Sequence, residues 1–316
     1  MCERYRFKVL KGFMMVLKQS DRSCYVCGAV QNPIVASETC YSEEFKKNKL
    51  PEGQYSLIKC RSCGLTYVDS DVTDQYLSQF YQLHSPESDD EYNSMIKELT
   101  EGETRCGDFS RQWQIIKTLR RPINDDRLLD IGCATGEAGM IAKEDNVSLY
   151  GHDLSKAYAY ICRRRWDVGA DHVISTMLED ESFPRGFFSY ITSYETLEHM
   201  TNPSRVLDLM KNWLKPDGII AISVPASDYF VIKHNCLKKF NRSGLVHGHI
   251  FNFTPKSCKL LLERSGFEPV YIGPANWSVN AAGSIIRTAY YFLKALSGSR
   301  IFFAPSVFAV AKHKAF

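Results

Sequence analysis

The sequence predicts an α/β fold in which a mostly parallel sheet is covered by helices on both faces and is preceded by a small cysteine-rich domain. From residue 127 onward, short apolar runs alternate with helical patterns, which is typical of parallel strands joined by crossover helices. Residues 20–72 instead carry two Cys-x-x-Cys motifs in a stretch rich in turn-forming residues. The length of 316 residues accommodates about two domains.

The expected elements follow in order along the chain. Apolar runs predict strands at 127–131, 149–153, 172–175, 188–193 and 219–224, and helical periodicity predicts helices at 137–143, 156–166, 204–214 and 256–265. The strands expected at 268–272 and 307–311 lack an obvious crossover of the same kind, so the end of the sheet should be built differently. Before the sheet, looser helical patterns span 75–81, 91–99 and 108–119.

The composition excludes several classes of protein. Apolar residues make up 44% and charged residues 24% of the chain, as in ordinary globular proteins, and no apolar stretch approaches the ~20 residues of a membrane-spanning helix. With 39 basic and 36 acidic residues the net charge is +3, which argues against a nucleic-acid partner. The 11 cysteines are scattered, and the first 18 residues lack a secretory pattern. We therefore expect a cytoplasmic protein.

A glycine turn follows the first strand of the predicted sheet. In RLLDIGCATG, Gly132 and Gly136 let the backbone approach a ligand, and the following helix offers free N–H groups. A dinucleotide fingerprint would need glycines at 134 and 137, where the chain has Ala134 and Glu137, and a carboxylate there would repel a pyrophosphate. S-adenosylmethionine (SAM) is cationic and compatible with acidic neighbours. Ala134 is accommodated if its φ is negative.

The pattern D-x-G-x-A-x-G from Asp130 to Gly136 resembles motif I of class I SAM-dependent methyltransferases. The resemblance covers about residues 115–316, and it implies a Rossmann-like sheet of seven strands with a reversed C-terminal hairpin. It also implies the residues that bind SAM, which are Asp130, Gly132, Ala134, Gly136, Asp153, Leu154, Leu178, Glu179 and Ser193.

Later strand ends carry the same resemblance. Asp153 ends the second strand with a carboxylate that can accept hydrogen bonds from both ribose hydroxyls. Leu178 and Glu179 follow the third strand, where the family brackets the adenine with an apolar and an acidic residue. The stretch FSYITSYETLEHM, residues 188–200, resembles the fourth strand and its following loop, and LKPDG precedes the fifth.

Four cysteines form two knuckles of the sequence Cys-x-x-Cys-Gly. Cys24 and Cys27 with Cys60 and Cys63 offer the tetrahedral set of four thiolates that suits structural zinc, and such a closed site is not catalytic. Redox chemistry between the two pairs is the minor alternative. Knuckles, helical linker and methyltransferase core in this order resemble a bacterial family of zinc-ribbon methyltransferases, which is associated with the tailoring of glycans or small metabolites.

A second group of metal-ligand residues follows the fourth strand. Glu195, Glu198 and His199 stand at i, i+3 and i+4, so they share one face if the loop enters a helical turn, and His249 offers a fourth ligand. The pattern resembles the ubiquinone-pathway O-methyltransferases and the terminal 2′-O-methyltransferases of small RNAs, in which it is taken to bind Mg²⁺. The alternatives are His199 acting directly as a general base and a purely structural role.

The resemblance and the composition together divide the chain. We expect a basic amphipathic segment at 1–19, a zinc-ribbon-like domain at 20–72, a helical linker at 73–115 and a methyltransferase domain at 116–316 with a helical insertion at 275–304. The apolar helix faces at 1–18 and 281–296 could each contact the inner face of a membrane. For 1–18 the alternative is packing on its own domain or on a partner chain, and for 281–296 it is a lid over an apolar substrate or a homodimer contact.

These observations predict an enzyme. The expected reaction is SAM-dependent O-methylation of a hydroxylated small molecule or glycan, with Glu195, Glu198 and His199 as the catalytic residues. C-methylation of a sugar or metabolite, 2′-O-methylation of an RNA end, and a non-catalytic SAM-binding scaffold are the alternatives. The expected cofactors are SAM, structural Zn²⁺ and Mg²⁺ at the acidic–histidine residues.

Overall fold

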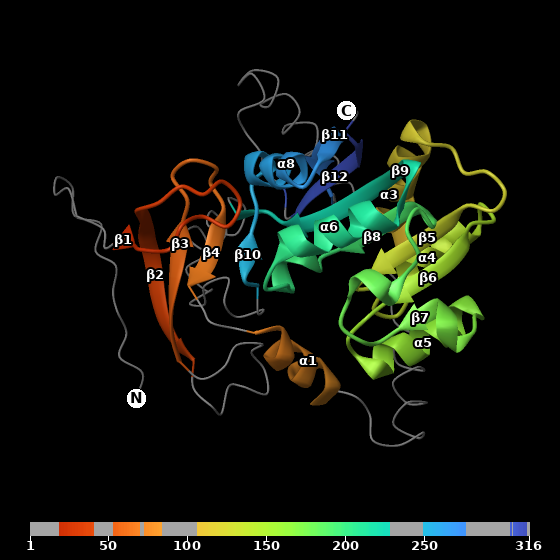
Figure 1. Cartoon of the computed structure of the whole chain (residues 1–316), viewed down its shortest axis with the longest axis horizontal. Helices are drawn as coiled ribbons and strands as arrows, with labels where there is room; N and C mark the ends of the chain where they lie inside the picture. The colour runs from red at the N-terminus through yellow and green to blue at the C-terminus, as the bar shows by residue number, and fades with distance from the viewer. Residues whose placement is uncertain are drawn as a thin grey trace.

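The computed structural model describes residues 19–40, 53–69, 73–83, 106–227, 249–275, 304 and 306–314. Figure 1 shows two sheets side by side: a smaller one drawn mostly in red and orange, and a larger one with its helices in yellow, green and blue. Helix α1 (Asp74–Leu83) follows the smaller sheet in the chain and lies beneath the gap between the two sheets in this view.

The larger sheet has seven strands in the order β11-β12-β9-β8-β5-β6-β7. Their bounds are β5 (Arg127–Ile131), β6 (Ser148–His152), β7 (Val173–Ile174), β8 (Phe188–Tyr194), β9 (Leu214–Pro225), β11 (Phe267–Pro274) and β12 (Ser306–His313). Strands β5 to β9 are parallel, whereas β12 runs antiparallel to both β9 and β11. This order, with its reversed C-terminal hairpin, confirms the predicted Rossmann-like α/β fold.

Helices cover both faces of the larger sheet, as predicted. They are α3 (Cys106–Leu119), α4 (Glu137–Lys143), α5 (Lys156–Trp166), α6 (Pro203–Trp213) and α8 (Pro255–Arg264). Successive residues of β5 point to opposite faces: Leu128 packs in a cluster with Trp113 of α3 and Trp166 of α5, while Leu129 packs in a cluster with Trp213 of α6. Burial on both faces explains why the central strands read as continuous apolar runs.

Local capping sets the helix starts. The Thr254 hydroxyl accepts a hydrogen bond from the Ser257 N–H at 3.1 Å, and the Ser257 hydroxyl accepts one from the Thr254 N–H at 2.8 Å, which forms a capping box at the start of α8. Asn202 caps α6 by accepting from the Arg205 N–H at 3.1 Å. The four predicted helices from 137 to 265 match α4, α5, α6 and α8 to within one residue.

Strands β7, β8, β9, β11 and β12 differ in length from the prediction, and for β9 and β7 the cause is local. Strand β9 begins at Leu214 instead of residue 219, because the LKPDG segment continues the pairing and Leu214 lies opposite Phe188. Strand β7 has two residues instead of four, because Ala170–His172 forms a 3₁₀ turn.

The smaller sheet contains a strand from the far end of the chain. Its order is β1 (Gln19–Ser20), β2 (Asn32–Cys40), β3 (Gly53–Lys59), β4 (Thr66–Asp69) and β10 (Phe251–Asn252), with each pair antiparallel. In Figure 1 the blue β10 stands between the orange β4 and the larger sheet. This pairing could not be predicted from the sequence, because a two-residue strand has no measurable periodicity. We call β1 to β4 with their knuckles the cysteine domain.

Several predicted features lie outside the described residues. They are the segment 1–18, the helix at 91–99 and, apart from Ala275 and Ala304, the insertion at 275–304 with its helix at 281–296. Across the ranges that the structure does describe, every helix is too short or too polar to span a membrane.

Candidate active site

A cavity of about 260 Å³ opens at the carboxyl ends of the parallel strands β5, β6 and β8. This is the edge of an α/β sheet at which ligands bind in general. Seven of the residues singled out from the sequence line it: Gly132, Ala134, Asp153, Leu154, Leu178, Glu195 and His199. The predicted strand ends therefore converge on one space.

The glycine loop, residues 132–136, has a strained backbone. Gly132 has φ 75°, and a Cβ there would lie 2.1 Å from the Thr196 hydroxyl oxygen, so a side chain is excluded by both conformation and space. Gly136 also has a positive φ of 80°, but its neighbour is the Trp166 indole, whose N–H donates to the Gly136 carbonyl at 2.6 Å. Gly136 serves helix packing and is not among the residues that line the cavity.

The expectation of a negative φ at Ala134 is wrong, because its φ is 45°. The left-handed conformation costs an alanine about 1–2 kcal/mol. The carboxylate of Asp153 offsets this cost, since its Oδ2 accepts the Ala134 N–H at 3.0 Å. Alanine thus replaces the glycine that the methyltransferase pattern has at position 134, and its hydrogen bond to Asp153 after β6 stabilises the loop.

Asp153 links the glycine loop to the helix after β6. Its Oδ1 accepts the Ser155 N–H at 2.9 Å, while Oδ2 holds Ala134. The residue is 9% exposed and lines the cavity. Each carboxylate oxygen can accept more than one hydrogen bond, so the same group can also accept from ligand hydroxyls.

Three other residues predicted to bind SAM stand outside the cavity lining. Asp130 is buried and accepts a hydrogen bond from the Thr192 hydroxyl at 2.7 Å. Its burial raises the pKa of Asp130 to about 7, and the negative charge of Asp153 adds to the rise. Ser193 is fully buried in β8, and Glu179 is half exposed and forms an ion pair with Arg205. These residues support the walls of the site.

The loop after β8 does not form the expected continuous helical turn. Glu195 has a positive φ of 50°, and the 3₁₀ turn begins only at Leu197. The Glu195 side chain accepts from the Ser223 hydroxyl at 2.6 Å, and its N–H donates to the Ser223 carbonyl at 2.8 Å. Because the left-handed residue breaks the helical phase, the i, i+3, i+4 argument does not hold for Glu195.

The structure does bring Glu198, His199 and His249 together, and we call these three the Glu–His group. One ligand atom from each lies within 4.8 Å of the others. The two imidazole rings meet edge to face, with centroids 4.8 Å apart, and His199 Nε2 lies 3.9 Å from Glu198 Oε1. Glu198 is 0% exposed, and an ionised carboxylate at that depth requires a cation or hydrogen bonds close by.

Helix α1 also contributes to the cavity, which the sequence did not suggest. Asp74, Leu77 and Tyr81 line it, although α1 lies in the stretch expected to be a linker. Asp74 accepts a hydrogen bond from Thr201, which fastens the start of α1 to the loop before α6. Burial raises the pKa of Tyr81, and the charges of Asp153 and Glu198 raise it further.

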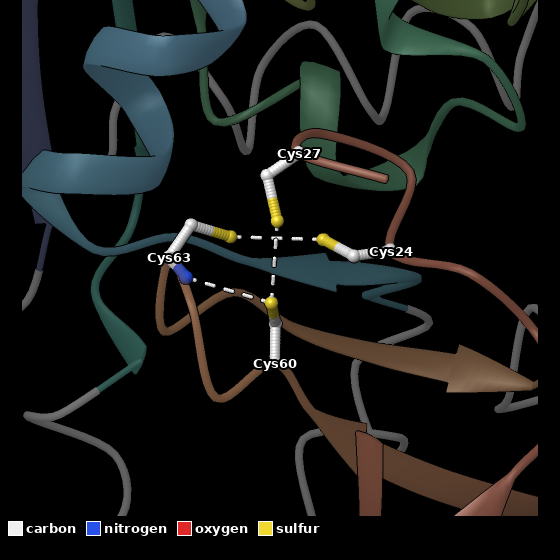
Figure 2. A group of neighbouring side chains, drawn as sticks. All are labelled: Cys24, Cys27, Cys60 and Cys63. Carbon is white, nitrogen blue, oxygen red and sulfur yellow. Dashed lines mark hydrogen bonds between the residues drawn. The ribbon is translucent and has the colours of Figure 1, made fainter. Parts of the chain in front are cut away.

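Figure 2 shows the four knuckle sulfurs pointing toward a common centre. The Sγ atoms of Cys24 and Cys63 are 3.6 Å apart, and those of Cys27 and Cys60 are 3.4 Å apart. Tetrahedral zinc with Zn–S bonds of about 2.3 Å would place sulfurs about 3.8 Å apart, so the residues present fit that ion.

The glycine after each knuckle has a defined role. Gly28 and Gly64 both have positive φ, and their N–H groups donate to the carbonyls of Cys24 and Cys60 at 2.8 and 3.0 Å. In the second knuckle, the N–H of Cys63 also points to the Cys60 sulfur at 3.5 Å. The Cys-x-x-Cys-Gly pattern therefore forms the same turn twice.

A parallel sheet with a glycine loop after β5 and a carboxylate after β6, both opening on one cavity, defines an α/β protein of the class that binds nucleotide-containing cofactors. Within that class, the chain belongs to the methyltransferase domain family, whose model matches residues 108–272, just over half of the sequence.

Curated relatives include two methyltransferases of different acceptor chemistry. Phosphoethanolamine N-methyltransferase 2 of Caenorhabditis elegans is 25% identical over 183 residues, which cover 51% of this chain and 41% of the relative. Ubiquinone biosynthesis O-methyltransferase of Pasteurella multocida (strain Pm70) is 28% identical over 109 residues, covering 31% of this chain and 45% of the relative. The chain thus spans less than half the length of these relatives.

Similar solved structures include a SAM dependent methyltransferase from Archaeoglobus fulgidus, with a TM-score of 0.47 and 21% identity, covering 71% of this chain and 100% of that one. Another is phosphoethanolamine N-methyltransferase 2 of Haemonchus contortus in complex with S-adenosyl-L-methionine, with a TM-score of 0.43 and 16% identity, covering 65% of this chain and 52% of that one. Since both scores are below 0.5, the fold class rests on the strand order described above.

Proposed function

We propose that the protein transfers the methyl group of SAM to a hydroxyl oxygen of a small molecule or glycan. The observation that carries this proposal is the composition of the cavity wall. Asp153 and Leu178, with the chemistry to hold a ribose and an adenine, share the cavity with His199, a member of the Glu–His group. A cofactor site and a group able to activate an acceptor thus meet in one space, as methyl transfer requires.

In this proposal the cofactor half of the cavity is built by β5 and β6. The Asp153 carboxylate accepts the ribose hydroxyls while it continues to hold the Ala134 N–H. Leu154 and Leu178 supply apolar surface for the adenine. Gly132, which has no side chain, leaves room for the rest of the cofactor. SAM, when bound, supplies the reactive methyl group, and these residues fix its direction.

The acceptor half is built by the loop after β8 and by α1. His199 and Glu195 enter the cavity from the loop, and Tyr81 enters it from α1. A metal ion held by Glu198, His199 and His249 would lower the pKa of an acceptor hydroxyl. The chain's own task would then be to hold the acceptor oxygen in line with the methyl group and to keep water out.

The Glu–His group favours a different ion from the predicted Mg²⁺. Mg²⁺ prefers oxygen ligands and keeps several waters, whereas two imidazoles with one carboxylate suit Mn²⁺, Fe²⁺ or Zn²⁺. The expected second carboxylate, that of Glu195, is bonded to Ser223 instead. We therefore propose a transition metal at this position.

The alternative is that His199 acts as a general base without an ion. Its ring is 14% exposed and reaches the cavity, so the geometry allows it to take a proton from an acceptor. The two mechanisms differ in their dependence on pH and metal. If His199 acts as a base without a metal, the rate of methyl transfer falls as pH drops through about 6.5 and does not change when metal is removed.

We also propose that the four cysteines hold one structural zinc ion. Four thiolates at these distances repel each other unless a cation lies between them. With four protein ligands the coordination is complete, so this ion has no position for substrate. Its role is to stabilise the cysteine domain, which is small and needs such a link.

The test begins with cofactor binding. Calorimetric titration with S-adenosylhomocysteine (SAH) should give a dissociation constant in the micromolar range, while NAD should not bind. Equal or tighter binding of NAD would overturn the proposal.

Elemental analysis should find zinc at one ion per chain, and Cys60→Ser should release it.

The acceptor class is tested with labelled SAM and three panels of acceptors: hydroxylated compounds with vicinal hydroxyls, primary amines such as phosphoethanolamine, and enolisable carbon acids. Labelled product with the hydroxylated panel only, at a rate that requires Mn²⁺ after selective chelation, supports the proposal. Transfer to amines or carbon at a higher rate contradicts O-methylation. Full activity in a metal-free preparation contradicts the metal and leaves His199 as the base.

A further inference from the structure

The segment 249–254, which contains β10, is held between the two sheets. On one side β10 pairs antiparallel with β4 of the cysteine domain, with Phe251 opposite Tyr67. On the other side the Phe253 N–H donates to the Pro225 carbonyl at 2.9 Å, at the end of β9. A strand of two residues has too few bonds to be stable by itself, so its position depends on these neighbours.

The second cysteine knuckle holds the end of this segment directly. The Thr254 hydroxyl donates to the Cys63 carbonyl at 2.8 Å, and both groups are buried. Lys256, the second residue of the following helix α8, donates from Nζ to the Ser62 carbonyl at 2.6 Å. Both acceptors belong to the turn that carries the two thiolates Cys60 and Cys63. In Figure 2 the blue strand passes directly behind the four sulfurs.

The start of the same segment holds the Glu–His group. The Ile250 N–H donates to the Glu198 carbonyl at 2.7 Å, and the Ile250 carbonyl accepts from the Val68 N–H of β4 at 2.9 Å. His249 immediately precedes Ile250 in the chain, and its ring lies against that of His199. A continuous series of hydrogen bonds therefore runs from the knuckle turn through β4 and β10 to the backbone of Glu198.

We propose that the cysteine domain is a positioning element for the Glu–His group, and that metal binding at the four cysteines is coupled to the placement of His249 beside Glu198. Thr254 is the positioning residue at the knuckle end of this connection. This inference deepens the proposed function, because it takes from it the zinc at the cysteines and the catalytic use of the Glu–His group. It assigns the knuckles a task within the active site beyond stabilising their own domain.

The physical reason is that His249 has no stable element of its own. The remaining members of the Glu–His group follow β8, a seven-residue strand in the middle of the larger sheet. His249 instead precedes the two-residue β10, whose geometry is set by β4 and by the knuckle turn. Release of the metal would loosen the turn, then the Thr254 bond, and then the register of β10.

The experiment compares three variants of the full chain loaded with zinc. Thr254→Val keeps the shape of the side chain but removes the hydroxyl, and with it the bond to Cys63. Thr254→Ser keeps the hydroxyl and is the rescue control. Ser257→Ala weakens the other half of the α8 capping box while leaving the Thr254–Cys63 bond in place. Hydrogen–deuterium exchange of peptides covering 249–254, zinc content, SAH affinity and turnover are measured for each.

For Thr254→Val we expect exchange within 249–254 to be at least ten-fold faster, with zinc content unchanged and SAH affinity within two-fold of wild type. Turnover should fall at least ten-fold with the KM for SAM unchanged. Thr254→Ser should restore wild-type values, and Ser257→Ala should speed exchange only in the first turn of α8. Unchanged exchange in 249–254, or equal effects of Thr254→Val and Ser257→Ala, would overturn the proposal.

Metal ejection from the wild type gives a second measurement should Thr254→Val not fold. Zinc is displaced with a thiol-directed mercurial in the presence of saturating SAH, and exchange is followed in 249–254 and in 127–153. We expect faster exchange in the first segment and unchanged protection in the second. Retained protection in 249–254 contradicts the coupling. The exchange measurement needs no acceptor, so it stands even if the proposed O-methylation fails.

Discussion

The glycine loop and the Glu–His group each contribute residues to one cavity and are built in opposite ways. The loop is contiguous: Gly132, Ala134 and Gly136 fall within five residues, and Asp153 at the next strand end holds its middle through the Ala134 N–H. The Glu–His group joins Glu198 and His199 to His249, about 50 residues later, through a strand pair that involves the cysteine domain.

The difference shows what each region depends on. The glycine loop depends on local backbone conformation and on two packed side chains, Thr196 in the loop after β8 and Trp166 at the end of α5. The Glu–His group depends on the docking of two sheets. Changes in the loop should therefore act on cofactor binding, and changes in the cysteine domain should act on the Glu–His group, with little effect of either on the other.

The largest effect is expected from Gly132→Ala. The new Cβ would lie 2.1 Å from the Thr196 hydroxyl at a φ of 75°, so the loop must move and SAH binding should fall below detection. Gly186→Ala is the matched control, because Gly186 also has a positive φ, 61°, but open space around it. The control should lose only about 1 kcal/mol of stability and keep its SAH affinity. Equal SAH affinity in both variants would mean that the loop is less constrained than the structure indicates.

Glu198→Gln should have the next largest effect, on the other region. Loss of a buried ligand charge should weaken Mn²⁺ binding and turnover by on the order of 100-fold, while SAH affinity stays within about two-fold. Glu195→Gln is the comparison, because a glutamine oxygen can still accept from the Ser223 hydroxyl. Metal titration followed by electron paramagnetic resonance would measure both. If Glu195→Gln weakened Mn²⁺ as much as Glu198→Gln, both carboxylates would belong to the metal site, as the sequence first suggested.

Asp153→Asn should weaken SAH binding by about 2 kcal/mol, or roughly 30-fold, because a neutral amide loses the charge-assisted bonds to the ribose. The amide also offers one oxygen where the carboxylate accepts from both Ala134 and Ser155. Glu179→Gln should change SAH affinity less, since Glu179 itself is outside the cavity lining and acts on it only through its partner Arg205. Isothermal titration of the two variants distinguishes them, and an equally large loss in Glu179→Gln would return that residue to the adenine site.

The smallest expected effect is a pH dependence of stability from Asp130. Burial raises its pKa from the ordinary 3.8 to about 7, so the protonated acid favours the folded state. That contribution is present below about pH 4 and is lost as pH rises through about 7. Asp130→Asn should remove this loss, so in urea unfolding without ligand its stability relative to wild type should rise between pH 5 and 8. Parallel profiles for the two proteins would argue against a raised pKa.

Much of the larger sheet could be predicted because its signals are local. The bounds of the strands and helices from 127 to 265 follow from apolar periodicity and capping residues. Each parallel strand can be recognised from its own apolar run and from its place in the alternation of strands and helices. The two cysteine knuckles could also be recognised from the sequence, since each is a five-residue turn whose glycine adopts a positive φ. The order of these elements was enough to indicate a SAM site at the ends of β5 and β6.

Other features depended on contacts between distant residues, and the sequence was silent or misleading about them. Helical spacing placed Glu195 on the same face as Glu198. In the structure, two hydrogen bonds with Ser223 hold Glu195 in a left-handed conformation, so it does not share a helical face with Glu198. The linker pattern gave no reason to place Tyr81 in the cavity.

The sequence by itself determined the α/β order, the glycine loop and the two knuckles, because hydrogen bonds within a few residues specify them. Only the tertiary structure decided that β10 joins the cysteine domain and brings His249 to Glu198. A two-residue strand carries no periodic signal, and its partner β4 lies about 180 residues away. Its place is therefore set by its contacts with β4 and with the end of β9 and not by its own residues.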